Sequence, residues 1–132
     1  MCSVLLVEDN RIFRGTLKGI LATRYPSISI EEASSAEEAL TEFQKISPFL
    51  IFMDIGLPDR NGLEITTTIK ETDPKIKIII LTSYDMAEYR EAASRSGANH
   101  YLEKGSVTIE VITSLVASAL KADKKCQNLI SD

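Results

Sequence analysis

The chain has 132 residues, a length that suits one domain with a real hydrophobic core. Apolar residues make up 44% and charged residues 26%, values that are ordinary for a soluble globular protein. The net charge of −4 argues against a surface built mainly to bind DNA or anionic lipid.

The first apolar stretch does not form a signal peptide, because Glu8, Asp9 and Arg11 interrupt it. No stretch approaches the roughly 20 apolar residues that span a bilayer. Cys2 and Cys126 lie near opposite ends and match no metal-binding spacing, so we expect reduced thiols rather than a structural disulfide. A cytoplasmic location with no membrane contact is the simplest interpretation.

Short apolar runs recur along the chain and predict strands at 3–7, 28–33, 49–53, 76–81 and 98–102. The runs 49–53 and 76–81 are mostly apolar, which is typical of strands covered on both faces. Helical patterns separate these runs. The first two contain Phe13, Leu17, Ile20 and Leu21, then Ala36, Ala39, Leu40, Phe43 and Ile46.

The helix boundaries are marked by capping residues. Ser35 and Glu38 fit a capping box at the start of the second helix. A third helix should begin near 62–63 and stop before Pro74, and a fourth should run over 86–95 and end at Gly97. The fifth should start after Ser106 as N-cap. Its inward positions are expected to be Ile109, Ile112, Leu115, Val116 and Ala119.

Five strands alternating with five helices predict an α/β fold with a doubly wound parallel sheet. The flavodoxin-like strand order 2-1-3-4-5 fits, with helices on both faces. Such sheets bind ligands outside the carboxyl ends of their strands, here between strands one and three. Glu8 and Asp9 end strand one and Asp54 ends strand three, so the three carboxylates should share one crevice.

A phosphoryl group and a metal ion would give each residue in this crevice a role. Glu8 and Asp9 supply hard oxygen ligands for Mg²⁺, or for Mn²⁺ in its place. Asp54 is a carboxylate nucleophile that can form an acyl phosphate. Thr82 and Lys104 end the last two strands on the same edge and can hold phosphoryl oxygens.

At this point the residues resemble a known family, the receiver domains of two-component response regulators. Glu8 and Asp9 match the acidic pair that follows strand one in that family. The phosphoacceptor loop has an Asp, a Pro four residues later and a Gly eight residues later. Asp54, Pro58 and Gly62 match this pattern.

The resemblance extends over about residues 3–121. Thr82 matches the hydroxyl residue after strand four, and Tyr101 matches the aromatic residue three positions before the family's lysine, Lys104. Each match is weak alone, and all of them in order at these spacings form a strong signal. We therefore assign residues 1–122 to a receiver domain and 123–132 to a C-terminal tail or the start of a linker.

The resemblance implies a phosphoacceptor. A histidine kinase or phosphotransfer protein would donate its phosphoryl group to Asp54. The metal would be held by Asp9, Asp54 and the backbone carbonyl of Gly56, with Glu8 acting partly through water. The chain would then be a switch, not an enzyme, although it would assist its own Mg²⁺-dependent phosphorylation and dephosphorylation.

The resemblance also implies how the switch is read. Thr82 would move toward the phosphate and Tyr101 would turn inward, repacking the surface of helix four, strand five and helix five. Partners would bind there, and a homodimer would use that surface or the surface of helices one and five. The sequence looks most like receivers that precede a helix-turn-helix output, which is absent from these residues; a stand-alone receiver and a piece of a longer regulator both fit. Direct nucleic-acid binding by this segment is not expected.

Three positions depart from the common pattern. Gly56 has no side chain to reach the phosphate, and Tyr84 is bulky enough to cover Thr82, so we predict that Gly56 and Tyr84 tune the acyl-phosphate lifetime in a direction the sequence does not fix. Gly105 stands where many members have a cis proline. We expect a trans bond here, because cis costs about 3 kcal/mol before a non-proline residue.

Three other functions compete with this interpretation. A haloacid-dehalogenase-type phosphatase needs a second Asp two residues after its nucleophile, where this chain has Gly56, and its nucleophile would end strand one. A flavodoxin-like FMN binder needs a phosphate loop after strand one, where Glu8 and Asp9 would repel the phosphate. A degenerate receiver that binds partners without phosphorylation is disfavoured by the complete set of acids, Thr82 and Lys104.

Overall fold

The structure, a computed structural model, describes residues 2–84 and 86–127. Strands and helices alternate along it. The strands are β1 (Ser3–Val7), β2 (Ser29–Ala33), β3 (Leu50–Met53), β4 (Lys77–Thr82) and β5 (His100–Glu103). The helices are α1 (Arg11–Arg24), α2 (Ala36–Ile46), α3 (Gly62–Thr72), α4 (Ala87–Ser96) and α5 (Ile109–Ala122).

The strands form one parallel sheet in the order β2-β1-β3-β4-β5, which confirms the predicted topology. The register places Val7 beside Ala33 on one side and beside Met53 on the other. The carboxyl ends of β1 and β3 therefore stop level with each other. The residues that follow them emerge at the same edge of the sheet.

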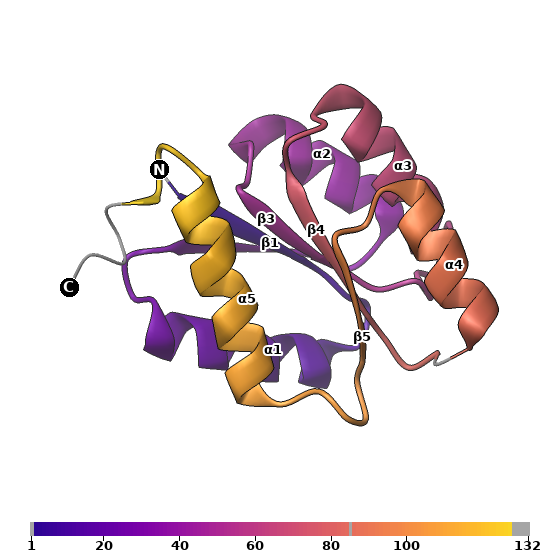
Figure 1. Ribbon diagram of the computed structural model, residues 1–132, viewed down its shortest axis with the longest axis horizontal. Helices are drawn as coiled ribbons and strands as arrows, with labels where there is room; N and C mark the ends of the chain where they lie inside the picture. The colour runs from indigo at the N-terminus through magenta and orange to yellow at the C-terminus, as the bar shows by residue number, and fades with distance from the viewer. Residues whose placement is uncertain (1, 85, 128–132) are drawn as a thin grey trace.

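Helices cover both faces of the sheet, as Figure 1 shows, with α1 and α5 together and α2 beside α3. Alternate strand residues point to opposite faces. Leu6, Phe52 and Ile79 pack in the hydrophobic cluster that includes residues of α1 and α5. Leu5 and Ile51 pack in the other cluster, with residues of α2, α3 and α4.

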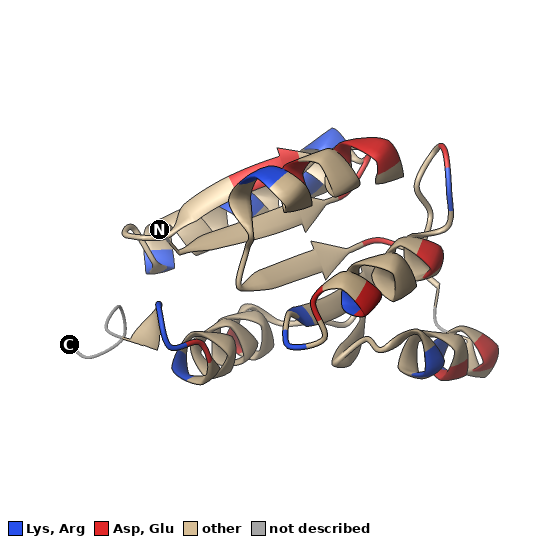
Figure 2. Cartoon of the chain, turned by 90° about the horizontal axis from the view of Figure 1, so that it is seen from above, with Lys and Arg blue, Asp and Glu red and all other residues tan. Residues whose placement is uncertain are grey.

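Charge is concentrated on helices and loops, whereas the central strands are apolar (Figure 2). This pattern explains why β1 and β3 read as nearly continuous hydrophobic runs. Among the described residues, no helix combines the length and the apolar character needed to cross a membrane.

Most predicted helix ends are confirmed. Ser35 is the N-cap of α2 and accepts from the Glu38 amide, and Gly97 ends α4 with a φ of 99°. The predicted start of the fifth helix is wrong. Its N-cap is Thr108, which accepts from the Val111 amide, whereas the backbone at Ser106 forms a turn back to Glu103.

The expected inward face of α5 is also wrong at one position. Ile112, Val116 and Ala119 are buried and Leu115 is partly buried, but Ile109 is 55% exposed. Ile109 is the first residue of α5, so it lies at the N-terminal end of the helix and outside the hydrophobic cluster that the later residues join.

The expectation of two reduced thiols is contradicted by the structure, in which Cys2 and Cys126 form a disulfide with a Cα–Cα distance of 5.7 Å. The separation of 124 residues in sequence hid this proximity. Helix α5 follows β5 and returns across the sheet, so its end comes back to the start of β1 (Figure 1). Both cysteines are buried in the same hydrophobic cluster.

The segment predicted as a tail is described as far as residue 127 and continues from α5 in turns. Cys126 and the backbone bonds from Cys126 and Gln127 to Asp123 fold this part back against the sheet. Residues 128–132 of the predicted tail lie outside the described residues.

Candidate functional site

Two of the acidic residues continue the backbone hydrogen bonding of the sheet. The amide of Glu8 donates to the Ala33 carbonyl at 2.9 Å, and the amide of Asp54 donates to the Val7 carbonyl at 3.0 Å. These bonds extend the β1–β2 and β1–β3 pairing by one residue. The sheet itself therefore fixes where the Glu8 and Asp54 side chains begin.

Glu8, Asp9 and Asp54 lie together at this edge. One carboxylate oxygen from each falls within 4.8 Å of the other two. Glu8 and Asp54 are only 4% and 6% exposed, while Asp9 faces solvent. Burial raises the pKa of Glu8 above its ordinary value, although the Lys104 ammonium acts in the opposite direction. Such a cluster is stabilised by added positive charge.

Lys104 supplies part of that charge. Its ammonium lies 2.5 Å from a Glu8 oxygen and 3.5 Å from an Asp54 oxygen, and it sits 4.7 Å from the centre of the Phe13 ring. Three ionised carboxylates and one ammonium leave two negative charges. The donor set of hard oxygens and this residual charge suit a divalent cation such as Mg²⁺.

Lys104 is positioned by the end of β5. Its amide donates to the Thr82 carbonyl at 2.8 Å, which continues the β4–β5 pairing. The described residues contain no cis peptide bond, so the bond between Lys104 and Gly105 is trans as expected. Thr82 is fully buried, and its hydroxyl accepts from the Tyr84 amide at 3.3 Å.

The loop after Asp54 folds tightly around its carboxylate. The Gly56 amide lies 3.4 Å from the Asp54 side chain as a long hydrogen bond. The Gly62 amide donates to the Ile55 carbonyl at 2.9 Å, which draws the start of α3 onto the loop. Asp59 reaches across to α2, where its carboxylate accepts from the amide of Ala36.

The two residues predicted to tune the acyl phosphate lie next to each other. A Cβ built on Gly56 would lie 3.5 Å from a ring carbon of Tyr84, so the Tyr84 ring stands over the glycine. The ring stacks on Tyr89 with centroids 5.1 Å apart. Tyr101 is half-buried and its hydroxyl donates to the Tyr84 carbonyl.

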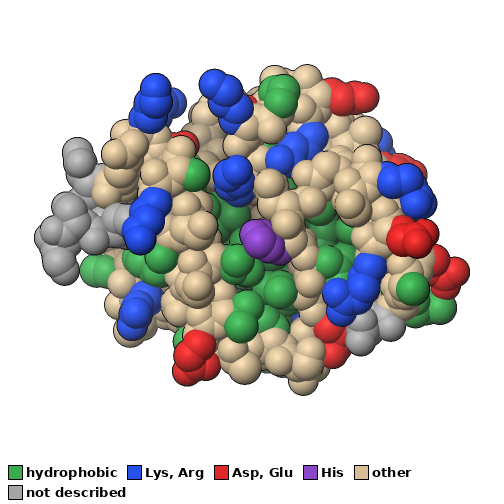
Figure 3. Space-filling model, viewed as in Figure 1, with side chains coloured by type: hydrophobic (Ala, Val, Ile, Leu, Met, Phe, Trp, Pro, Cys, Tyr) green, Lys and Arg blue, Asp and Glu red, His purple; other side chains and the backbone are tan. Residues whose placement is uncertain are grey.

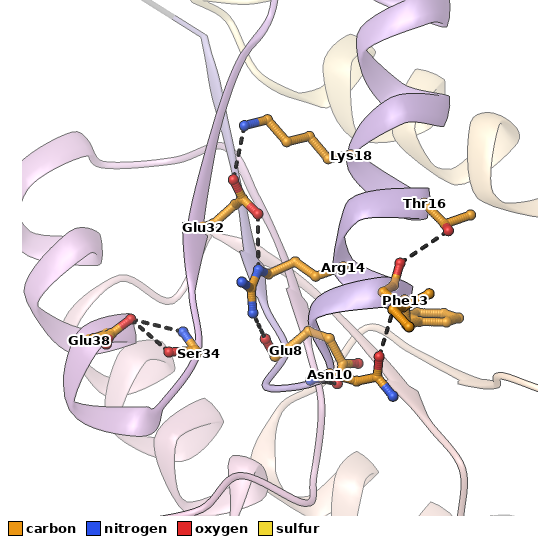
Figure 4. Close-up of polar contacts among 10 residues, drawn as sticks. Glu8, Asn10, Phe13, Arg14, Thr16, Lys18, Glu32, Ser34 and Glu38 are labelled. Atoms are coloured by element: carbon orange, nitrogen blue, oxygen red, sulfur yellow. Dashed lines mark hydrogen bonds and ion pairs between the residues drawn. The ribbon is translucent and has the colours of Figure 1, made fainter.

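One polar network around this site escaped the sequence interpretation. Arg14 of α1 donates to the backbone carbonyl of Glu8 and to the carboxylate of Glu32 in β2, and Lys18 also donates to Glu32 (Figure 4). The only signal in the sequence was the spacing of Arg14 and Lys18 by one helical turn. Their shared partner comes from another strand and could not be assigned without the fold.

A family model described as the response regulator receiver domain matches residues 4–116. The chain is 37% identical over 101 residues to the chemotaxis protein CheY of Halobacterium salinarum, a match covering 76% of this chain and 82% of that protein. It is 36% identical over 103 residues to the response regulator protein VraR of Staphylococcus epidermidis. That match covers 76% of this chain but only 48% of VraR.

Solved structures share the fold. A two-component response regulator from Clostridium difficile aligns with a TM-score of 0.84 and 26% identity over 92% of this chain and 97% of that one. The response regulator TrrA from Thermotoga maritima, solved in complex with Mg²⁺ and beryllium fluoride, aligns with a TM-score of 0.79 and 32% identity. That alignment covers 91% of this chain and 100% of TrrA.

Proposed function

Because this chain belongs to the response regulator receiver domain family of two-component systems, we propose that Asp54 accepts a phosphoryl group from a histidine kinase or phosphotransfer protein. The observation that carries this proposal is the placement of Asp54 beside Glu8, Asp9 and Lys104 at one edge of the sheet. A buried carboxylate in that setting can act as a nucleophile toward phosphorus while its surroundings balance the charge.

The transfer forms one bond and breaks one. An oxygen of the Asp54 carboxylate forms a bond to phosphorus, and the nitrogen–phosphorus bond of the donor phosphohistidine breaks, with its electron pair returning to the histidine. Water later attacks the phosphorus, the bond between phosphorus and the Asp54 oxygen breaks, and inorganic phosphate leaves, which restores the carboxylate. No general acid is needed on this chain for the first step, since an uncharged histidine is an adequate leaving group when it takes up a proton from solvent.

The acidic residues fit a divalent cation. Asp9, Asp54 and the backbone carbonyl of Gly56 would hold it, with Glu8 acting partly through water. A bound Mg²⁺, or Mn²⁺, would neutralise charge on the phosphoryl oxygens and the carboxylates. The complex of TrrA with Mg²⁺ and beryllium fluoride supports this assignment, because TrrA shares the fold over its whole length.

Lys104 and Thr82 would bind the phosphoryl oxygens. Lys104 already contacts the Asp54 carboxylate. Its ammonium therefore needs only a small shift to reach an oxygen of a phosphoryl group attached to that carboxylate. The Thr82 hydroxyl accepts from the Tyr84 amide, and its own hydrogen would donate to a phosphoryl oxygen once Thr82 moves toward the phosphate.

Movement of Thr82 would be the signal. Tyr101 is tied through its hydroxyl to the Tyr84 carbonyl, two residues from Thr82, so a shift in this loop changes the support of the Tyr101 ring. We propose that Tyr101 then turns inward and alters the surface of α4, β5 and α5. Partners, or a second copy of the chain, would bind that surface or the surface of α1 and α5.

The role is that of a phosphoacceptor switch that assists its own phosphorylation and dephosphorylation. The nucleophile of a haloacid-dehalogenase-type phosphatase would end strand one, whereas Asp54 follows β3 and Gly56 offers no acid group. An FMN phosphate would meet the Glu8 and Asp9 carboxylates after β1. The position of the nucleophile therefore disfavours the phosphatase, and the negative charge after β1 disfavours the FMN binder.

The wider setting follows the same proposal. The receiver unit would comprise residues 1–122, followed by a tail or linker, and would regulate transcription where an output domain is attached. A cytoplasmic location would give Asp54 access to phosphohistidine donors. Basic side chains are scattered over the face in Figure 3. The net charge of −4 is our reason for proposing no direct role in binding nucleic acid.

Binding of beryllofluoride tests this proposal. The protein is titrated with beryllofluoride in the presence and absence of Mg²⁺, and amide NMR shifts report binding. We expect shifts at residues 54, 82 and 101 only when Mg²⁺ is present, and none in Asp54→Asn. The Asp73→Asn variant, which removes a half-buried carboxylate at the end of α3, should bind like the original protein. Absence of Mg²⁺-dependent shifts in the original protein would overturn the proposal.

A further inference from the structure

We infer that Arg14 is a positioning residue for the cation site, because it holds the backbone of the acidic loop in place and Glu32 orients it. The inference rests on the proposed function, since it concerns the cation that Glu8, Asp9 and Asp54 would bind. It adds a residue of α1 and a residue of β2, neither of which offers a ligand to the ion.

The contacts of Arg14 join the residue that follows β1 to a side chain of β2. Its Nη1 donates to the Glu8 backbone oxygen at 2.5 Å, and its Nε donates to Glu32 Oε1 at 2.9 Å. The side chain is only 16% exposed. Figure 4 shows the guanidinium between the end of β1 and the edge strand β2, with one nitrogen aimed at each acceptor.

Both backbone polar groups of Glu8, its amide and its carbonyl, are hydrogen-bonded. Its amide donates to the Ala33 carbonyl, and its carbonyl accepts from Arg14. Its carboxylate accepts from the Asn10 amide at 3.0 Å, across the position of Asp9. Asp9 is exposed, so its placement depends on the backbone on either side of it. Lys104 contacts the Glu8 carboxylate, whereas Arg14 is the charged side chain that holds the backbone of the loop, through the Glu8 carbonyl.

Glu32 determines where the guanidinium can sit. A guanidinium is a planar fork, so fixing its Nε sets the direction of its remaining donors. Glu32 receives Arg14 on one oxygen and Lys18 on the other, at 2.9 Å each. Glu32 of β2 therefore directs the Arg14 guanidinium toward Glu8. Lys18 binds the second oxygen of the Glu32 carboxylate and does not contact the acidic loop.

A loose acidic loop would bind a cation less well. Mg²⁺ demands near-ideal octahedral geometry, so ligand oxygens must be placed accurately before it binds. Partners that orient ligands typically account for about 10- to 100-fold in metal affinity. Loss of the Arg14 contact should weaken Mg²⁺ binding even though it removes a positive charge, a change that would by itself strengthen binding.

Three variants separate positioning from charge. Arg14→Ala removes the contact with the loop and one positive charge. Lys18→Ala removes one positive charge and a contact with the same Glu32 carboxylate, but leaves the loop contact in place. Glu32→Gln keeps the shape of the side chain and removes the charge that orients Arg14. Circular dichroism at the working temperature confirms that each variant is folded.

The first readout is the Mg²⁺ dissociation constant measured by calorimetry. We expect Arg14→Ala to raise it about tenfold, Glu32→Gln to raise it by a smaller factor, and Lys18→Ala to leave it within twofold. The second readout needs no metal. Hydrogen exchange of a peptide covering residues 8–10 should be faster in Arg14→Ala than in Lys18→Ala.

The inference is overturned if Arg14→Ala binds Mg²⁺ within twofold of the original protein, or if Lys18→Ala loses as much affinity as Arg14→Ala. A failure of the proposed function gives a different result. In that case the original protein itself binds no Mg²⁺, and Asp9→Asn changes nothing. The hydrogen-exchange comparison then decides the positioning role alone: equal exchange in the Arg14 and Lys18 variants overturns it.

Discussion

The backbone oxygen of Asp54 occupies the space in which a side chain on Gly62 would begin. A Cβ built on Gly62 would lie 1.9 Å from that oxygen and 2.9 Å from the Asp54 carbonyl carbon. The start of α3 is thus packed directly onto the backbone of the proposed phosphoacceptor. Only glycine permits this approach, which gives a physical reason for a glycine eight residues after Asp54.

Substitution of Gly62 should therefore disrupt the Asp54 loop. Because backbone atoms must move to admit a methyl group, we expect Gly62→Ala to lower the free energy of unfolding by about 3 kcal/mol or more. Gly15→Ala is the matched control, since nothing lies within 4 Å of its Cβ position in α1. It should stabilise by about 0.5–1 kcal/mol. Urea unfolding measures both, and equal effects would contradict this explanation.

Gly56 and Tyr84 should together set the lifetime of the acyl phosphate. The Tyr84 ring stands over Gly56. A ring in this place would hinder water from reaching the phosphate, so Tyr84→Ala should shorten the lifetime. Tyr84→Phe keeps the ring and should leave it unchanged. Gly56→Asn, whose Cβ fits at ordinary contact distance, should alter the lifetime by adding an amide beside the phosphate. Decay of the phosphorylated protein measures all three, and unchanged lifetimes in Gly56→Asn and Tyr84→Ala would refute this role.

The disulfide between Cys2 and Cys126 should contribute to stability. It closes nearly the whole chain into a loop, and loss of a native disulfide typically costs about 2–5 kcal/mol. We expect a reductant to lower the thermal midpoint of the oxidised protein. The Cys2→Ser/Cys126→Ser double variant should have the same thermal midpoint as the reduced protein, and reductant should not change that midpoint. A midpoint that does not depend on reductant, with thiols counted before and after, would show that the bond adds no stability.

Acid should weaken the network around Glu32. The Lys18 ammonium, and then the Arg14 guanidinium, hold the pKa of Glu32 below its ordinary value of 4.5. A carboxylate whose pKa is lower in the folded state contributes its full stabilisation of the fold when the pH is above its pKa in the unfolded state. That contribution is lost as the pH falls through its pKa in the folded state. Glu32→Gln should therefore flatten the fall of stability below about pH 4.5. Urea midpoints measured across this range test this, and parallel curves would contradict it.

The strands of the sheet could be predicted from the sequence because β1 and β3 are nearly continuous apolar runs, each followed by an acidic residue. The alternation of strands and helices predicted a parallel sheet, and the flavodoxin-like strand order placed Glu8 and Asp54 at one edge. The capping residues Ser35 and Gly97 could be recognised because caps are local. These features depend on neighbours in sequence, and they were predicted correctly.

What could not be predicted depends on contacts between distant residues. The pairing of Cys2 with Cys126 needs the return path of α5 across the sheet. The contact of Arg14 with the Glu8 carbonyl needs α1 to pack beside the end of β1. Thr108 replaced Ser106 as the cap of α5 because the backbone after Glu103 first forms a turn, and either hydroxyl residue satisfies the local pattern.

Intact-protein mass spectrometry after incubation with acetyl phosphate and Mg²⁺ shows whether Asp54 is the phosphoacceptor. We expect the mass to rise by one phosphoryl group in the original protein. The added mass should be absent with a chelator and in Asp54→Asn, and present in the Asp73→Asn control. No Mg²⁺-dependent adduct, or an adduct that persists in Asp54→Asn, would contradict the assignment.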